Sequence, residues 1–176
     1  CKMDFVFDAG YAFEKESIVA SSMGQLINKG TKAKTAKEFI ESVELLGAYY
    51  DSNTGGDNLT ITIYILSSKF REIIPLVLEL FHDALFSEEE VENYRSIQFQ
   101  KYLVNQEKVS FQSNNEFMKL IYPKGHIYSQ SLDEKDFVCI NKDRIIKFYE
   151  NQVKAKLFRV YISGNVDHAD PVSYTH

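Results

Sequence analysis

The chain has 176 residues, 44% of them hydrophobic, so it is long enough for one domain with a sizeable core, and a second domain is not expected. Its net charge is −5, from 20 basic and 25 acidic residues, and Lys and Arg form no extended cluster. This excludes the basic footprint of a nucleic-acid binder, and no apolar run is long enough to cross a bilayer, so we expect neither a nucleic acid nor a membrane as partner. Cys1 and Cys139 lack C-x-x-C spacing, which predicts neither a disulfide framework nor a cysteine zinc site, and they can pair only if the fold brings them together.

The first half of the chain alternates between strand and helix patterns. Thr35 and Glu38 form a Thr-x-x-Glu capping box ahead of an apolar stripe that ends at Gly47, which predicts a helix between them. A turn cluster at residues 52–58 precedes a run in which apolar residues alternate with Thr and Tyr, as in the second arm of a hairpin. The elements expected here are a strand at 5–10, helices at 17–27 and 36–46, and strands at 48–51 and 59–65.

The second half is mainly helical in pattern. Ser87-Glu88-Glu89-Glu90 is a second capping box that begins a long helix, and Asn141 caps a later one. The elements expected are helices at 69–84, from 88 past 101, at 111–121 and at 142–151, and a closing strand at 157–164. The order strand, two helices, hairpin, four helices, strand predicts an α+β fold, with a mostly antiparallel sheet and helices packed on one side.

No catalytic set stands out from the residues alone. No two histidines are three or four positions apart, so the zinc motifs H-E-x-x-H and H-x-x-E-H are absent; the histidines are His82, His126, His168 and His176. His82-Asp83 offers a base with an orienting carboxylate, but a histidine at a helix C-terminus also interacts favourably with the helix dipole. The acidic cluster of Glu88 to Glu92 could bind a cation, although carboxylates are favourable at any helix N-terminus.

Five short segments, taken in order, resemble motifs of the insulinase/pitrilysin family of zinc peptidases, which includes the mitochondrial processing peptidases and the core subunits of the respiratory bc1 complex. Residues 7–14 are similar to the family's first strand and G-S-x-x-E turn, and residues 26–31, Leu-Ile-Asn-Lys-Gly-Thr, to the M-L-F-K-G-T that ends its metal helix. Residues 41–54, 86–91 and 162–167 resemble its I-E-x-L-G-G-x-L-N-A-Y-T, F-x-E-E-E-L and V-x-G-D-V-D segments. The resemblance implies the α+β fold of this family, a LuxS/MPP-like metallohydrolase domain.

The resemblance also implies that the family's metal helix has lost its zinc motif. Counting back from the Lys-Gly-Thr that ends at residue 31 places the inverted H-x-x-E-H motif on residues 21–25. Ser21 and Gln25 then stand in place of the two histidines, and Gly24 in place of the catalytic glutamate. Ser and Gln are neutral and poor zinc ligands, and Gly has no side chain that could accept a proton from water.

The long helix supplies a second, separate comparison. Counting from Phe86 places the family's two functional glutamates, which are seven residues apart, on Tyr94 and Lys101. A lysine at a zinc-ligand position argues against a working site. The resemblance therefore implies no catalytic residues and no metal in this chain, with zinc expected only in a partner domain.

The function implied by the resemblance is non-catalytic. Family members are built from repeated domains that close like a clamshell, and commonly one domain holds zinc while its partner lacks the motif. We therefore expect residues 1–167 to be a single domain of a larger clamshell protein, residues 168–176 to be a C-terminal tail, and another insulinase-family domain or subunit to be the partner. Such a domain helps to enclose or bind an extended peptide, and the matching edge-strand residues are Ala48, Tyr49, Tyr50, Asp51 and Ser52.

Two alternatives remain at this point. One is a purely structural or assembly subunit, like the core proteins of the bc1 complex, in which an apolar interface covers the edge strand. The other is an active zinc metallopeptidase with unusual ligands, which the absence of His, Glu and Cys at ligand spacing disfavours. The resemblance leaves the compartment open between a bacterial cell envelope and an organelle.

Overall fold

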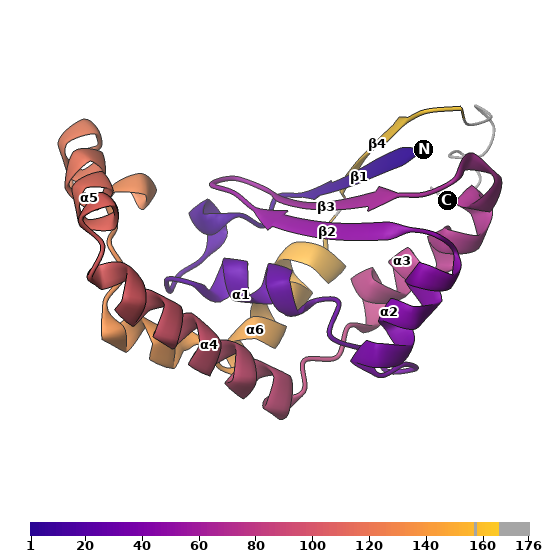
Figure 1. Ribbon diagram of the computed structural model, residues 1–176, viewed down its shortest axis with the longest axis horizontal. Helices are drawn as coiled ribbons and strands as arrows, with labels where there is room; N and C mark the ends of the chain where they lie inside the picture. The colour runs from indigo at the N-terminus through magenta and orange to yellow at the C-terminus, as the bar shows by residue number, and fades with distance from the viewer. Residues whose placement is uncertain (157, 166–176) are drawn as a thin grey trace.

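The computed structural model describes residues 1–156 and 158–165, and its centre is one antiparallel sheet (Figure 1). The strands are β1 (Lys2–Phe7), β2 (Tyr49–Thr54), β3 (Leu59–Tyr64) and β4 (Arg159–Ser163), in the spatial order β2-β3-β1-β4. The first and last strands of the sequence are therefore neighbours, and β2 and β4 form the two edges. In register, Phe5 of β1 lies opposite Ile61 of β3 and Val160 of β4.

The helices are α1 (Val19–Leu26), α2 (Ala36–Leu45), α3 (Phe70–Asp83), α4 (Glu88–Gln106), α5 (Val109–Ile121) and α6 (Lys142–Tyr149). Of these, α1, α2, α3 and α6 cover one face of the sheet, on the lower side in Figure 1. Short 3-10 turns are at Tyr11–Phe13, Ser67–Lys69, Ile127–Ser129 and Glu134–Cys139, and a π-helical turn follows α6 at Glu150–Lys154. The α+β class and the one-sided arrangement of helices predicted from the sequence are confirmed.

The core lies between the sheet and the helices. Alternate residues of β1 and β3 point into it and are buried, because successive strand side chains face opposite sides of a sheet. An aromatic cluster fills its centre, where the Phe81 ring of α3 lies 5.2 Å from Phe5 and 4.9 Å from Phe7, centroid to centroid. Phe158 closes the cluster at 4.9 Å from Phe7 and 5.3 Å from Phe81. The three contacts of the Phe81 ring are edge-to-face, and such contacts add to the stability that the burial of apolar area already provides.

Two helices, α4 and α5, extend from this body and form what we call the helical arm (Figure 1). In α4 the buried residue is Val91, and α5 has no buried residue among those described. A small aromatic cluster attaches the arm, with the Phe137 ring 5.4 Å from Phe99 and 5.1 Å from Tyr102. Exposed apolar side chains recur along the arm, among them Val109, 77% exposed, and Leu120, 86% exposed.

Most local predictions agree with the structure. The predicted order of strands and helices is the observed one, and the capping box of α2 is present in full, with Thr35 and Glu38 each bonding the other's backbone N–H. Gly47, which ends α2, has a φ of +67°, in the left-handed region that glycine adopts without a steric penalty. No described helix is long and apolar enough to span a membrane.

Several boundaries differ. β1 occupies residues 2–7 rather than 5–10, and β2 runs to Thr54 through residues predicted as a turn, because pairing with β3 continues to the Thr54–Leu59 pair. Ser87 caps α4 by accepting from the Glu90 N–H at 3.2 Å, but no reciprocal Glu90 bond completes the predicted capping box in the described part of the chain. The sulfurs of Cys1 and Cys139 are free thiols. Residues 166–176, which include the predicted tail, His168 and the end of the closing motif, lie outside the described residues.

Candidate functional site

The first helix, α1, begins with an unfavourable backbone conformation and a side-chain cap from upstream. Ile18, at its N-cap, has a φ of +74°, where a β-branched residue is an outlier. The Glu14 carboxyl group supplies the cap, because its two oxygens accept hydrogen bonds from the backbone N–H groups of Ile18 (3.3 Å) and Ala20 (2.8 Å). The 3-10 turn Tyr11–Phe13 is held in turn by the β2–β3 loop, to whose carbonyls its N–H groups donate at 2.8 and 3.1 Å. Helix, turn and loop thus form one connected wall.

A cavity of about 590 Å³ lies between this wall and α4, and we call it the α1–α4 cavity. Three of the five positions matched to the family's active site line it, namely Ser21 from α1 and Tyr94 and Lys101 from α4. Aromatic side chains form much of the remaining lining, among them Tyr11, Tyr102, Phe111, Tyr128 and Phe137. Its volume is typical of small-molecule sites, which hold roughly 300–1,000 Å³. That these positions correspond to the family's metal site stays a prediction.

The charged groups of the cavity differ in their hydrogen-bond and ion-pair partners. Burial raises the pKa of Glu14 to about 7, although its two backbone N–H donors act in the opposite direction. Glu16 forms an ion pair with Arg144 at 2.8 Å. Lys101 makes no ion pair or hydrogen bond to any other described residue. Burial also raises the pKa of Tyr94 and of Tyr11, so both phenols stay protonated at neutral pH.

These residues do not fit a zinc ion. An ammonium group such as that of Lys101 is a donor and not a ligand, and the Ser21 hydroxyl already donates to the Ile18 carbonyl at 3.0 Å. Over residues 1–156 and 158–165, no three or more His, Cys, Asp or Glu side chains lie close enough together to hold a metal ion. No reaction step can therefore be derived through a metal in this cavity.

Gly24 and Gln25 do not line the cavity, and they contact β2. A Cβ atom on Gly24 would lie 2.4 Å from Thr54 Oγ1 and 2.9 Å from Leu59 Cδ1. Both distances are shorter than real Cβ contacts, so any side chain at residue 24 requires the buried side chains of Thr54 and Leu59 to shift. The Ser52 hydroxyl also donates to the Gly24 carbonyl at 2.7 Å. The position matched to the catalytic glutamate is thus sterically closed as well as lacking a base.

The predicted peptide-binding strand is an edge of the sheet, as expected. Tyr49 is 62% exposed and Asp51 is exposed, whereas Thr54 is buried beside Gly24. The amide of Gln25 donates to the Ser52 backbone carbonyl at 3.2 Å, so α1 already occupies one acceptor of this edge strand. Tyr50 has a buried hydroxyl that makes no hydrogen bond within the described residues. Whether these residues bind a peptide stays a prediction.

The other candidate groups lie elsewhere and have local partners. Asp83 pairs with Lys32 at 2.9 Å, and His82 is exposed. His126 accepts a hydrogen bond at Nδ1 from the Tyr128 N–H at 3.2 Å, and its ring stacks on Tyr122. The acidic cluster of Glu88 to Glu92 lies at the N-terminus of α4, where carboxylates offset the helix dipole.

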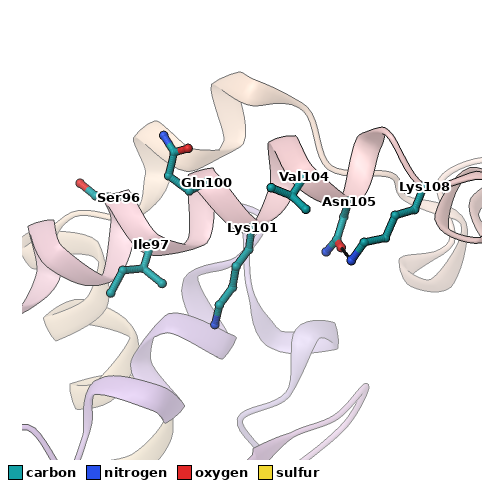
Figure 2. A pocket seen from close by; sticks show the side chains of 7 residues that line it. All are labelled: Ser96, Ile97, Gln100, Lys101, Val104, Asn105 and Lys108. Carbon is teal, nitrogen blue, oxygen red and sulfur yellow. Dashed lines mark hydrogen bonds between the residues drawn. The ribbon is translucent and has the colours of Figure 1, made fainter.

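A second depression, of about 610 Å³, follows one side of α4 (Figure 2). Its lining comes from α4 and from Lys108 just after it, and includes the exposed side chains of Ile97 and Val104. We call it the α4 trough. It is an open surface feature, and it shares Lys101 and Asn105 with the α1–α4 cavity. The two depressions therefore adjoin each other at Lys101.

Comparison with known proteins places this arrangement in a family. The sequence profile of the insulinase family, peptidase family M16, matches residues 1–122. The chain belongs to the insulinase family.

The insulinase-family relatives include a protein described as an uncharacterized zinc protease from Rickettsia bellii, 23% identical over 158 residues, which covers 89% of this chain and 38% of the relative. Among solved structures, the peptidase M16 inactive domain from Pseudomonas fluorescens superimposes with a TM-score of 0.89 at 18% identity, covering 98% of this chain and 43% of that one. A protease from Helicobacter pylori gives a TM-score of 0.83 at 20% identity, covering 98% and 42%. The chain thus spans about two-fifths of the length of these proteins. The structural likenesses establish the insulinase-family fold.

Sequence reasoning did not identify the wall before α1 as part of a site. Glu14 entered only as the end of a turn motif, and neither Tyr11 nor Tyr128 was singled out. The spacing of Glu14 ahead of a helix start was an available signal, because a carboxylate four residues before the first helical N–H groups can cap them. Tyr128 carried no such signal, since its place in the cavity depends on how the segment after α5 folds back.

Proposed function

We propose that this chain is a non-catalytic insulinase-family domain that helps to enclose an extended peptide, while a partner domain or subunit of the same family supplies the zinc site. Residues 1–167 are then one domain of a larger clamshell protein. The observation that carries the proposal is the chemistry of the α1–α4 cavity, where Ser21, Tyr94 and Lys101 meet. A hydroxyl, a phenol and an ammonium group offer neither ligands for zinc nor a base for the water that zinc activates.

Two further features support a non-catalytic role. A point substitution cannot restore a glutamate at residue 24 without displacing Thr54, because the α1 backbone lies against β2. The relatives are also more than twice as long as this chain, which leaves room for a second domain of similar size. A peptide held at β2 would add to the exposed edge of the sheet as a further strand, the mode in which backbone hydrogen bonds provide most of the affinity.

The absence of catalysis is tested by elemental analysis and proteolysis. The purified chain is dialysed against metal-free buffer, assayed for zinc, and incubated with an unstructured fluorogenic peptide with and without added zinc. We expect well under one equivalent of zinc and no cleavage in either condition. Stoichiometric zinc together with chelator-sensitive cleavage would contradict the proposal and favour an active peptidase with unusual ligands.

Peptide addition at β2 is tested with backbone-methylated peptides. An extended peptide of about eight residues is compared with two versions that carry N-methyl groups at odd or at even positions. A peptide that adds to β2 uses alternate N–H groups, so one methylated version should bind about tenfold more weakly while the other is little changed. Equal binding of all three, or no binding at all, would contradict peptide addition.

The structural or assembly subunit is the second candidate, and the helical arm favours it. Exposed apolar side chains recur along α4 and α5, including Phe117, 58% exposed, and Leu120, 86% exposed. If the chain serves only in assembly, the partner should cover β2 as well as the arm. Hydrogen exchange of the assembled complex distinguishes the two functions, because the outward N–H groups of β2 stay unprotected if the edge is open to peptides.

A further inference from the structure

We propose that the α1–α4 cavity binds a carboxylate through the side-chain amine of Lys101, with the aromatic wall of the cavity holding the apolar part of the same ligand. The occupant is an acid with an aromatic or aliphatic body. This binding site is separate from the edge of β2, so the proposal does not depend on peptide addition to that strand.

The charged groups in and beside the cavity differ in whether they already have a partner. Each carboxylate in or beside the cavity already has a donor: Glu14 has the two N–H groups of α1, and Glu16 has Arg144 at 2.8 Å. Asp136, whose charge also acts on Glu14, accepts from the Asp133 N–H at 2.7 Å. The amines of Lys101 and of Lys15, both exposed and both in the lining, have no such partner among the described residues. The cationic groups of the lining are thus the ones open to a ligand, which favours an anion over a cation.

The side chain of Lys101 is directed away from the exposed side of α4 on which Gln100 lies. Figure 2 shows its side chain leaving α4 toward the ribbon of the N-terminal segment, whereas Gln100 leaves the helix on the opposite side. Residues 11–12 and 14–18 of that N-terminal segment line the α1–α4 cavity together with Lys101. A charge-assisted hydrogen bond from a lysine to a carboxylate is about twice as strong as a neutral one.

The remaining lining selects the body of the ligand. Tyr11, Tyr94 and Tyr128 line the cavity with amphipathic side chains, and Phe111 and Phe137 add apolar surface. Aromatic rings take flat or aliphatic groups by stacking and burial, while the phenolic O–H groups can donate to a second carboxylate oxygen. A metal cation, by contrast, would meet the ammonium group of Lys101, while the carboxyl groups of Glu14 and Glu16 are already engaged by backbone N–H groups and by Arg144. The ligand chemistry is thus a carboxylate joined to an apolar group.

Two sources can provide this chemistry, namely the C-terminal residue of a peptide and a small free carboxylic acid. The probes are an octapeptide that ends in Phe with a free carboxylate and carries an uncharged BODIPY label, the same peptide with a C-terminal amide, and unlabelled N-acetylphenylalanine as competitor. Binding is followed by fluorescence anisotropy. We expect the acid peptide to bind about tenfold more tightly than the amide, the difference that one charge-assisted hydrogen bond provides. Competition by N-acetylphenylalanine at similar concentrations points to a small acid, and its failure to compete points to a peptide C-terminus.

Substitutions at lysine positions assign the effect to the cavity. Lys101→Met keeps the length of the side chain and the helix propensity but removes the charge, and it should reduce binding of the acid peptide to that of the amide. Lys101→Arg should retain most of the affinity. Lys147→Met, on the exposed surface of α6, removes the same charge away from the cavity and should leave binding unchanged. Circular dichroism of each variant checks that the chain remains folded.

Two results would overturn the proposal: equal affinity for acid and amide peptides, or unchanged binding in Lys101→Met. Absence of binding by both peptides and by N-acetylphenylalanine at millimolar concentration would also overturn it. This test can be distinguished from the test of peptide addition to β2. Binding in the cavity tolerates N-methyl groups inside the peptide, whereas addition to β2 does not depend on the C-terminal carboxylate. Either proposal can thus fail while the other stands.

Discussion

The sheet body, made of β1 to β4 with α1, α2, α3 and α6, and the helical arm differ in how they are stabilised. Residues of β1 and β3 such as Phe7 and Ile61 are fully buried, while the 19 residues of α4 contribute Val91 alone to the buried set and α5 contributes none. A helix with little buried area depends on capping and side-chain pairs for its stability. The body therefore stabilises the fold, and the arm presents surface beside the α1–α4 cavity.

The largest contrast should come from the same substitution made in both regions. Phe81→Ala removes a ring that contacts Phe5, Phe7 and Phe158, and we expect it to lower the free energy of unfolding by about 3–5 kcal/mol. Phe117→Ala, at a position 58% exposed on α5, should cost less than about 0.5 kcal/mol. Urea denaturation followed by circular dichroism measures both. Similar losses would mean that the arm has its own core and that the contrast is wrong.

The next effect concerns the two faces of α1. Gly24→Gln places a side chain against Thr54 and Leu59, and we expect a loss of about 1–3 kcal/mol in unfolding free energy. Ser21→Gln brings the same side chain into the cavity, where there is room, and should change stability by less than about 1 kcal/mol. Thermal unfolding of the two variants side by side provides the measurement. A stable Gly24→Gln variant would show that the side chains of Thr54 and Leu59 can move aside.

Glu14 should make the stability of the chain depend on pH. Its folded-state pKa is raised to about 7, so its contribution is fully present below the ordinary glutamate pKa and is lost as the pH rises through 7. The melting temperature of the chain, relative to that of Glu14→Gln, should therefore fall between pH 5 and pH 8. Glu107→Gln, at the end of α4, serves as a control for the loss of one carboxylate. If the difference in melting temperature between the unsubstituted chain and Glu14→Gln stays constant across this range, the Glu14 carboxyl group is in contact with water and its pKa is not raised.

The smallest effect compares helix caps in the two regions. Thr35→Ala removes the capping box of α2 and should cost about 1 kcal/mol in global stability, since α2 packs on the body. Ser87→Ala removes the single capping bond of α4, and because the arm is lightly packed, the loss should appear as faster hydrogen exchange in the first turn of α4 with little change in global unfolding. An equal global loss in both variants would tie the arm more closely to the body.

Local signals were sufficient for the order of elements and for the fold class. The capping box at Thr35 and Glu38, the glycine that ends α2 and the alternation from Leu59 onward act over a few residues, and each predicted its element correctly. The end of β2 was not predictable in this way. Its polar residues carry turn propensity, and only pairing with β3 keeps them extended as far as Thr54.

The sequence by itself determined that this chain lacks the residues of a zinc peptidase motif, because ligand chemistry depends on which side chains are present. Only the tertiary structure decided that Ser21 and Lys101, far apart in the chain, line one cavity, that Gly24 is closed off by Thr54, and that Glu14 is buried enough to raise its pKa. The proximity of distant segments and the burial of a carboxyl group both depend on how the helices pack on the sheet. A local sequence pattern cannot predict either of them.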